Sequence, residues 1–115
     1  MTSSTIWFEE SYSFASKLIR ENSSPDDIIY CTEDIVGLCL AVASGRATAN
    51  YLLPEVYSKG RTDPYADSKI IIILKYHDPR SVSEIVNKYG LVLLGENEIL
   101  DVYKNPKAKA KMAIK

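Results

Sequence analysis

The run Lys69–Tyr76 (KIIIILKY) constrains the fold of this chain more than any other stretch. Its continuous β-branched and aliphatic residues are typical of a strand rather than a helix. Because side chains alternate between the two faces of a sheet, a strand that is apolar at every position must be covered on both faces. The run therefore predicts a central strand of a mainly parallel sheet. Ile71 and Ile73 are expected on one face, with Ile70, Ile72 and Leu74 on the other.

Helical and strand patterns alternate around this run. Helices are expected at about residues 5–20, 35–43 and 79–89, and strands at 27–31, 48–53, 69–76, 91–95 and 98–104. The order α-β-α-β-β-α-β-β predicts a single three-layer-like α/β domain with right-handed crossovers and a mainly parallel sheet. The last two strands are joined by so short a connection that they must form a C-terminal antiparallel hairpin. The helix at 35–43 is apolar on all sides, so it is expected to be buried on most faces.

Turn and capping residues mark the ends of these elements. Asp78-Pro79 has the N-cap and first-position residues of a helix start. Gly45 and Gly90 stand where left-handed helix ends are expected. Residues 54–68 show no regular pattern, and structureless stretches of this length are often functional or disordered.

Length and composition set the class of protein. With 115 residues, 46% of them hydrophobic, the chain fits one domain, which we expect to span residues 1–104 with a Lys-rich tail at 105–115. Neither a signal peptide nor a membrane span is expected, which favours a cytoplasmic protein. The chain contains no Gln and is rich in Ile, Lys and Glu. This bias is typical of thermophilic proteins.

The candidate functional residues follow two strands. Glu33 and Asp34 come after the strand at 27–31, while His77, Asp78 and Arg80 come after the central strand. Ligands bind beyond the carboxyl ends of strands in open parallel sheets, so these residues form a candidate catalytic or metal-binding group. The irregular stretch would cover the group with further ligand contacts from Tyr57, Arg61 and Tyr65. The competing interpretation is that each acid only caps its own helix.

Several specific chemistries lack their motifs. There is no phosphate-binding glycine loop after the first strand, and acids stand there instead. There is no Gly-x-Ser-x-Gly elbow and no Cys/His cluster, and the chain has a single histidine. Cys31 and Cys39 are interpreted as buried thiols. We therefore expect no metal site and no cofactor.

Positive charge gathers at the C-terminus. The segment 104–115 carries five lysines and no acid after residue 104, whereas the rest of the chain has nine basic and fifteen acidic side chains. Lys107, Lys109 and Lys111 form a candidate nucleic-acid contact. The segment contains neither arginine nor an aromatic residue for base stacking, so a solvated terminus is the favoured interpretation.

Short motifs resemble a known family. They are the run from Ala15 to Tyr30, then Ser44-Gly45-Arg46, then Lys88–Gly95 with Asp101-Val102-Tyr103. Together they resemble the soluble C-terminal domain of membrane glycosyltransferases of the dolichyl-phosphate-mannose type. A small archaeal domain of unknown function is the alternative resemblance. The first resemblance implies a fold in which a helix, a Pro-Asp turn, a strand, a Gly-Arg loop and a closing hairpin follow in this order. The catalytic carboxylates of that family lie in its membrane part, so no residue role is carried over.

The sequence as a whole predicts a binding or protein-interaction module rather than an enzyme. Two alternatives stay open: a small enzyme or metal-binding protein using the acids at the strand ends, and a nucleic-acid-associated protein using the lysines. The apolar hairpin at 91–104 would place a strand at a sheet edge, and edges invite pairing. We therefore also expect a homodimer.

Overall fold

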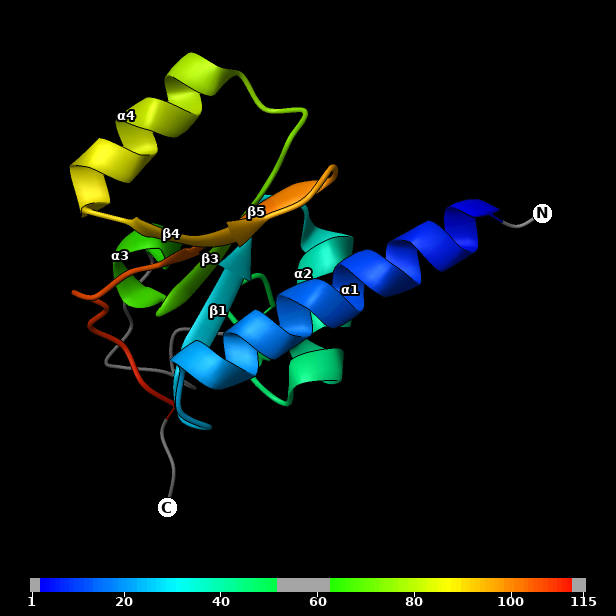
Figure 1. Ribbon diagram of the computed structural model, residues 1–115. Coiled ribbons are helices and arrows are strands. Elements are labelled where there is room, and N and C mark those ends of the chain that lie inside the picture. Colours follow the sequence, from blue (N-terminus) through cyan, green and yellow to red (C-terminus); the bar gives the residue numbers. More distant parts are fainter. Residues whose placement is uncertain (1–2, 52–62, 113–115) are drawn as a thin grey trace.

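The computed structural model describes residues 3–51 and 63–112. In this part of the chain, helices and strands alternate (Figure 1). The elements are α1 (Ser3–Asn22), β1 (Ile28–Cys31), α2 (Asp34–Ser44), β2 (Ala47–Thr48), α3 (Pro64–Asp67), β3 (Ile70–Leu74), α4 (Pro79–Tyr89), β4 (Val92–Glu96) and β5 (Leu100–Lys104). The expected elements are all present, although β2 is shorter than predicted. The short helix α3 lies in the stretch expected to be irregular.

The five strands form one mixed sheet in the order β2-β1-β3-β5-β4. β1 pairs in parallel with both β2 and β3, while β5 pairs antiparallel with both β3 and β4. The prediction of a mainly parallel sheet is therefore not confirmed. The physical reason is that the hairpin inserts its second strand, β5, against β3, so β3 has a parallel neighbour on one side and an antiparallel neighbour on the other.

β3 is the central strand, and all five of its residues are buried. Ile70, Ile72 and Leu74 belong to a core cluster with Ala15 and Ile19 of α1. Ile71 and Ile73 belong to a second cluster on the opposite face, which the half-buried side chains of α4 cover. The predicted alternation along β3 is confirmed.

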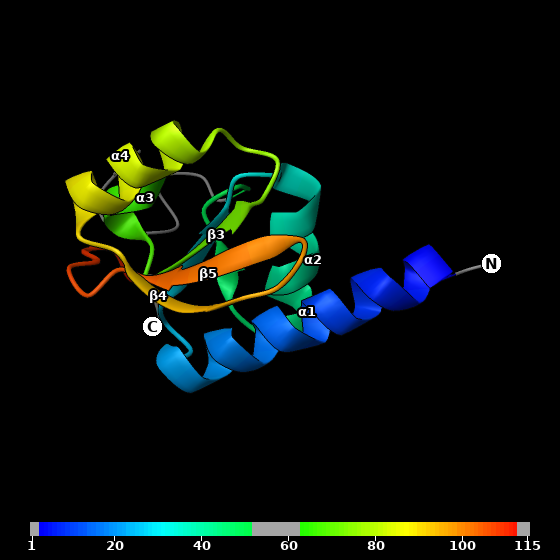
Figure 2. The same ribbon diagram turned by 45° about the horizontal axis from the view of Figure 1, so that its top comes forward.

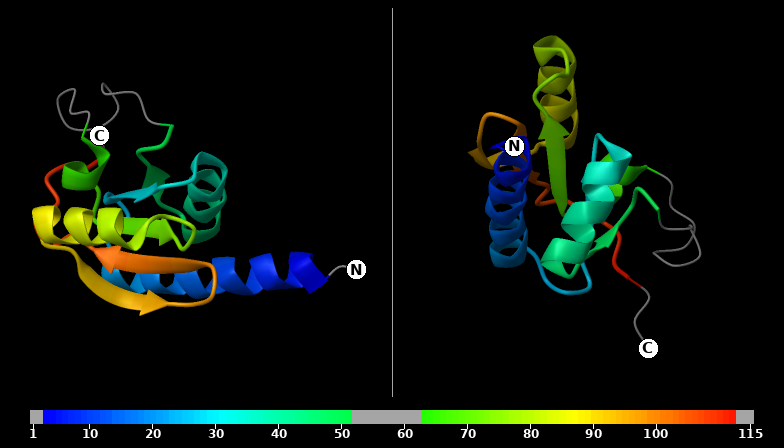
Figure 3. Two further views of the ribbon diagram at one scale, coloured as in Figure 1. Left: turned by 90° about the horizontal axis from the view of Figure 1, so that it is seen from above. Right: turned by 90° about the vertical axis from the view of Figure 1, so that its right-hand side faces the viewer.

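Helices cover both faces of the sheet (Figure 2). α1 and α2 pack against each other beneath one face, and α3 and α4 lie above the other. Two views at right angles show α1 running along the β4–β5 side of the sheet, with its N-terminal turns extending past it (Figure 3). The described residues thus form three layers, with the carboxyl ends of β1 and β3 side by side.

The prediction that the helix at 35–43 is buried on most faces is wrong. In α2 only Gly37, Leu40, Ala41 and Ser44 are buried. Ile35, Leu38 and Val42 are exposed. The helix lies at the outside of the domain, between α1 and the β2 edge, so an apolar sequence does not bring burial on every side.

Both predicted left-handed helix ends are present, and each is a glycine. Gly45 and Gly90 follow α2 and α4 with φ of 72° and 66°, and each N–H caps the preceding helix. At Gly37 the requirement is space, because an added Cβ would lie 2.8 Å from Asn50 Cγ and closer still to Asn50 Oδ1. α2 can approach the end of β1 this closely only because residue 37 has no side chain.

The Lys-rich segment is part of the fold up to Met112. Ala110 is buried in a small cluster with Ile28, and the Met112 N–H donates to the Asp26 carbonyl at 2.8 Å. Lys111 Nζ lies 2.6 Å from Asp27 Oδ1 and 3.5 Å from Asp26 Oδ1. Residues 105–112 are therefore packed at the start of β1 and are not a free tail. Among the described residues, no helix is both long and apolar enough to cross a membrane.

Candidate functional site

A cavity of about 290 Å³ lies at the carboxyl end of β3, between that strand, β5 and the first turns of α4. We name it the His77 cavity. Its apolar walls come from Ile73, Leu74, Pro79 and Val82, and its polar groups from Lys75, His77, Ser83 and Asp101. It occupies the edge of the sheet where the sequence predicts a site. The predicted residue that contributes to it directly is His77.

Two polar atoms of this lining are buried without a hydrogen-bond partner in the described part of the chain, namely His77 Nε2 and Asp101 Oδ1. Asp101 Oδ1 does have an ionic neighbour, because Lys75 Nζ lies 3.3 Å away. His77 instead has an aromatic neighbour, since its ring centroid lies 4.5 Å from that of Tyr76. A buried polar atom without a protein partner is uncommon, and an ordered water, an ion or another bound group usually satisfies it.

Lys75 forms ion pairs with two acidic side chains at the cavity. Its ammonium lies 2.5 Å from Glu96 Oε1 as well as 3.3 Å from Asp101 Oδ1. The hydrogen bond to Glu96, together with the two carboxylate charges, raises the pKa of Lys75. Register places these groups together, because Asp101 pairs with both Ile73 and Glu96 across the sheet. The Lys75 ammonium therefore lies between two carboxylates, and of these two the Asp101 carboxylate lines the cavity.

Glu33 reaches this region through a tyrosine. The Tyr76 hydroxyl donates to Glu33 Oε2 at 3.0 Å, and this hydrogen bond raises the pKa of the tyrosine. Tyr76 lies between Glu33 and His77, because β1 and β3 are parallel neighbours and end at the same edge. Glu33 has the N-cap position of α2, yet its side chain makes no capping hydrogen bond.

The remaining predicted acids have structural tasks. Asp34 Oδ1 accepts a hydrogen bond from Asn50 Nδ2 at 2.7 Å, on the β2 side of β1. Asp78 caps α4 by accepting from the Ser81 N–H at 3.3 Å. Arg80 is exposed on the first turn of α4. No described cavity is lined by the four candidates together, and no three described His, Cys, Asp or Glu side chains lie close enough to hold a metal ion.

The tyrosine expected as a ligand contact lies in a different cluster. Tyr65 packs edge-on against Tyr30, with ring centroids 5.2 Å apart, and stacks on Tyr89 at 5.5 Å. Burial raises the pKa of both Tyr30 and Tyr65. The Tyr89 hydroxyl donates to Asp63 Oδ2 at 3.0 Å. This stack joins α3 to α4. Tyr57 and Arg61 lie outside the described residues.

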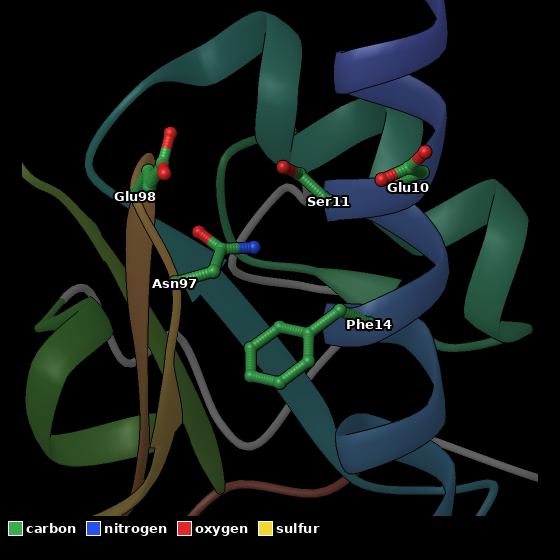
Figure 4. Close-up of a pocket in the computed structure, with 5 residues that line it drawn as sticks. All are labelled: Glu10, Ser11, Phe14, Asn97 and Glu98. Carbon is green, nitrogen blue, oxygen red and sulfur yellow. The ribbon is translucent and has the colours of Figure 1, made fainter.

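A second cavity, of about 370 Å³, lies between α1 and the turn of the hairpin. Phe14 and Asn97 face each other across it, with Glu10, Ser11 and Glu98 around them (Figure 4). Asn97 Oδ1 already accepts from the Ile99 and Leu100 N–H groups at 2.8 and 3.0 Å, so it shapes the turn. Both glutamates are exposed. These groups are weaker recognition elements than the buried atoms of the His77 cavity.

Within residues 3–51 and 63–112, the cysteines and the lysines do not form a further site. Burial raises the pKa of the Cys31 thiol to about 12, so this group stays protonated and unreactive near neutral pH. Cys39 is half-buried and also a free thiol. Lys107 and Lys109 are exposed, whereas Lys111 is engaged by Asp26 and Asp27. The candidate nucleic-acid contact is thereby left with fewer available charges.

Sequence reasoning missed four residues of this region: Lys75, Tyr76, Ser83 and Asp101. Asp101 had the clearest signal, because an acid stands between Leu100 and Val102 in a strand pattern. Its position beside β3 depends on the strand order, which local patterns do not encode.

Comparisons with known proteins give no relative on which to base a function. No family model, no curated protein and no solved structure matches this chain.

Proposed function

We propose that this protein is a small α/β binding module that takes a small, uncharged polar ligand in the His77 cavity. The observation that carries the proposal is the buried Nε2 atom of His77, which has no hydrogen-bond partner among the described residues. An unsatisfied buried polar group costs about 1–3 kcal/mol. A ligand hydroxyl or amide that meets this atom would recover that energy.

The size and chemistry of the lining indicate the class of ligand. About 290 Å³ is at the small end of the range for ligand pockets. The lining combines an ammonium, a carboxylate, a hydroxyl and an imidazole, so it offers both donors and acceptors beside apolar walls. Lys75 already balances Asp101 and Glu96. An anionic ligand would meet these carboxylates, so a neutral molecule bearing hydroxyl or amide groups fits best.

The lining favours binding over hydrolysis. Ser83, His77 and Asp101 have the residue types of a catalytic triad and lie around one cavity. A triad requires the histidine to hydrogen-bond both its nucleophile and its orienting acid. His77 Nε2 makes neither bond within the described chain, and Asp101 is turned to Lys75.

Nuclear magnetic resonance can test this proposal. A fragment set of neutral polyols and primary amides, with matched anionic and cationic fragments, is titrated into isotope-labelled protein. We expect neutral fragments to shift the amide signals of His77, Ser83 and Asp101. His77→Phe keeps a ring against Tyr76 but removes Nε2, so it should weaken binding about tenfold, equivalent to about 1.4 kcal/mol.

Arg80→Ala serves as the control, because Arg80 is exposed on the same helix and does not line the cavity. The Arg80→Ala protein should bind the neutral fragments with the same affinity as the wild type. Shifts confined to charged fragments would contradict the assigned ligand class. A cavity that responds to no fragment, or binding that is unchanged in His77→Phe, would overturn the proposed site.

A further inference from the structure

The cavity between α1 and the hairpin turn has an acidic lining and an aromatic wall. Its volume is about 370 Å³, and Phe14 supplies the ring (Figure 4). Glu10 comes from α1 and Glu98 from the turn, and neither forms an ion pair with another described residue. No lysine or arginine of the described chain lines this space. We name it the Phe14 cavity.

Ser11 directs an unpaired hydroxyl into this cavity. The residue is only 5% exposed, and its Oγ atom points from α1 toward the hairpin turn (Figure 4). Buried serines in helices commonly donate to the carbonyl four residues earlier. Ser44 does so, with its Oγ 2.6 Å from the Leu40 carbonyl oxygen. No hydrogen bond joins the Ser11 hydroxyl to any other described residue, so it is available to a bound molecule.

Contact with β4 holds the ring of Phe14 in the cavity wall. A Cβ added at Gly95 would lie 3.1 Å from Phe14 Cζ and 2.9 Å from Leu18 Cδ1, so α1 packs directly on the strand backbone there. The spacing of residues 10, 11 and 14 places a carboxylate, a hydroxyl and this ring on one side of α1. A ring that is already held in place loses little conformational freedom when a ligand binds.

We propose that the Phe14 cavity binds a small organic ammonium ion, namely a primary amine with a short apolar chain. Its N–H groups donate to the carboxylates of Glu10 and Glu98, which are the strongest acceptors in the lining. The Ser11 hydroxyl oxygen accepts a further hydrogen bond. The face of the Phe14 ring attracts the cation, and the ring also packs against the carbon chain.

The same lining disfavours the other classes of ligand. An anion would meet two carboxylates without a cationic side chain to offset them. A calcium ion prefers six to eight oxygen ligands, whereas no three described His, Cys, Asp or Glu side chains lie close enough to share a metal ion. Asn97 adds no charge, and its Oδ1 atom is already engaged by the turn. The site shares no lining residue with the His77 cavity, so it is independent of the ligand proposed there.

Nuclear magnetic resonance titration of isotope-labelled protein tests the site with a set of matched four-carbon probes. Butylammonium chloride should shift the amide signals of Ser11, Phe14 and Glu98, and added salt should weaken its binding. Butanol and sodium butyrate, which have the same chain without the positive charge, should leave these signals in place. His77→Phe should bind butylammonium as the wild type does, so this site and the His77 cavity are tested separately.

Variants assign the contacts within the site. The double variant Glu10→Gln with Glu98→Gln should weaken butylammonium binding about tenfold, because two exposed ion pairs are lost. Phe14→Leu keeps an apolar side chain against Gly95 and should weaken binding about threefold. Glu21→Gln is the matched control, since Glu21 is exposed on the same helix but does not line the cavity. Its affinity for butylammonium should be unchanged.

Ser11→Ala separates a ligand contact from a structural role. Alanine is the better helix former, so this variant should be at least as stable as the wild type to urea while binding butylammonium about threefold more weakly. A Ser11→Ala protein that loses stability, or that keeps its full affinity, would overturn the assigned role. Butanol or calcium chloride that shifts the same signals as strongly as butylammonium would overturn the ligand class. Full affinity in the double glutamate variant would overturn the site.

Discussion

At the scale of single residues, the Asn50 side chain makes four hydrogen bonds that join β1, β2 and α2. Its carboxamide accepts from the Cys31 N–H at 3.0 Å and donates to the Cys31 carbonyl at 2.8 Å, as the peptide group of a neighbouring strand would. It also contacts Asp34 and the Thr48 hydroxyl, both at 2.7 Å. The side chain thus continues the pairing of β1 beyond the end of β2. Nothing in the sequence around residue 50 indicates that the Asn50 side chain pairs with β1 in place of a strand.

The first prediction concerns the contact between Asn50 and Gly37. Gly37→Ala should destabilise the protein by ~1–3 kcal/mol, because the new Cβ would overlap a carboxamide that four hydrogen-bonding partners hold in place. Urea unfolding measures the change. In an Asn50→Ala background the same substitution should cost little, since alanine is otherwise the better helix former. An equal cost in both backgrounds would show that the carboxamide is not the obstacle.

Asp78 and Asp34 differ in how far along the chain their hydrogen-bond partners lie. Asp78 was expected either to cap its helix or to join a site, and the structure gives it the cap. Asp34 was expected to have the same choice, but it holds Asn50 instead. A capping pattern is local, so the sequence reveals it. A contact 16 residues away depends on how α2 packs against β2.

At the scale of elements, β3 and α2 show when an apolar sequence means burial. Both are strongly apolar, and β3 is buried throughout while α2 exposes three aliphatic residues. A strand in the middle of a sheet has neighbours on both edges and layers on both faces. A helix of an outer layer always has one side turned from the sheet, whatever its composition. Composition alone therefore predicts the position of β3 but not that of α2.

The second prediction compares these two elements. Ile72→Ala should destabilise the protein by ~2–5 kcal/mol, because the side chain is fully buried and its removal leaves a cavity. Val42→Ala changes a side chain that is exposed on α2 and should alter stability by less than about 0.5 kcal/mol. Both are measured by urea unfolding at a protein concentration low enough to keep the chain monomeric. Similar losses for the two variants would mean that Val42 is covered within the monomer.

At the scale of the whole molecule, the C-terminal segment closes the fold onto the start of β1. Asp27 accepts from Lys111 Nζ, 84 residues away, and from the Ser24 N–H at 2.8 Å. Burial of Asp27 on its own would raise its pKa. The bonds from Lys111 and Ser24, with the charges of Lys111 and Lys69, outweigh that effect, so the pKa of Asp27 is lowered.

The third prediction follows from this lowered pKa. Ionised Asp27 stabilises the fold above its unfolded pKa of about 3.9, and this contribution is lost as the pH falls through the lower folded pKa. Asp27→Asn should therefore be less stable than the wild type by ~1.5–3 kcal/mol near neutral pH, and the difference should shrink below about pH 4. Thermal or urea unfolding across this range measures it. Lys111→Met should show the same trend and exposed Lys109→Met should not, whereas a difference independent of pH would rule out the charge of Asp27 as its source.

The sequence by itself determined the central strand and most of the other elements, but not the short helix α3. The apolar period, the Asp-Pro helix start and the two glycine ends are local signals, and each corresponds to an element end in the structure. Tertiary structure alone decided the strand order, because the hairpin places β5 rather than β4 beside β3. That choice brings Asp101 beside Ile73 and so helps to form the His77 cavity. Tertiary structure also decided which side of α2 is covered, because that side packs against α1, β1 and β2, which are separate elements of the chain.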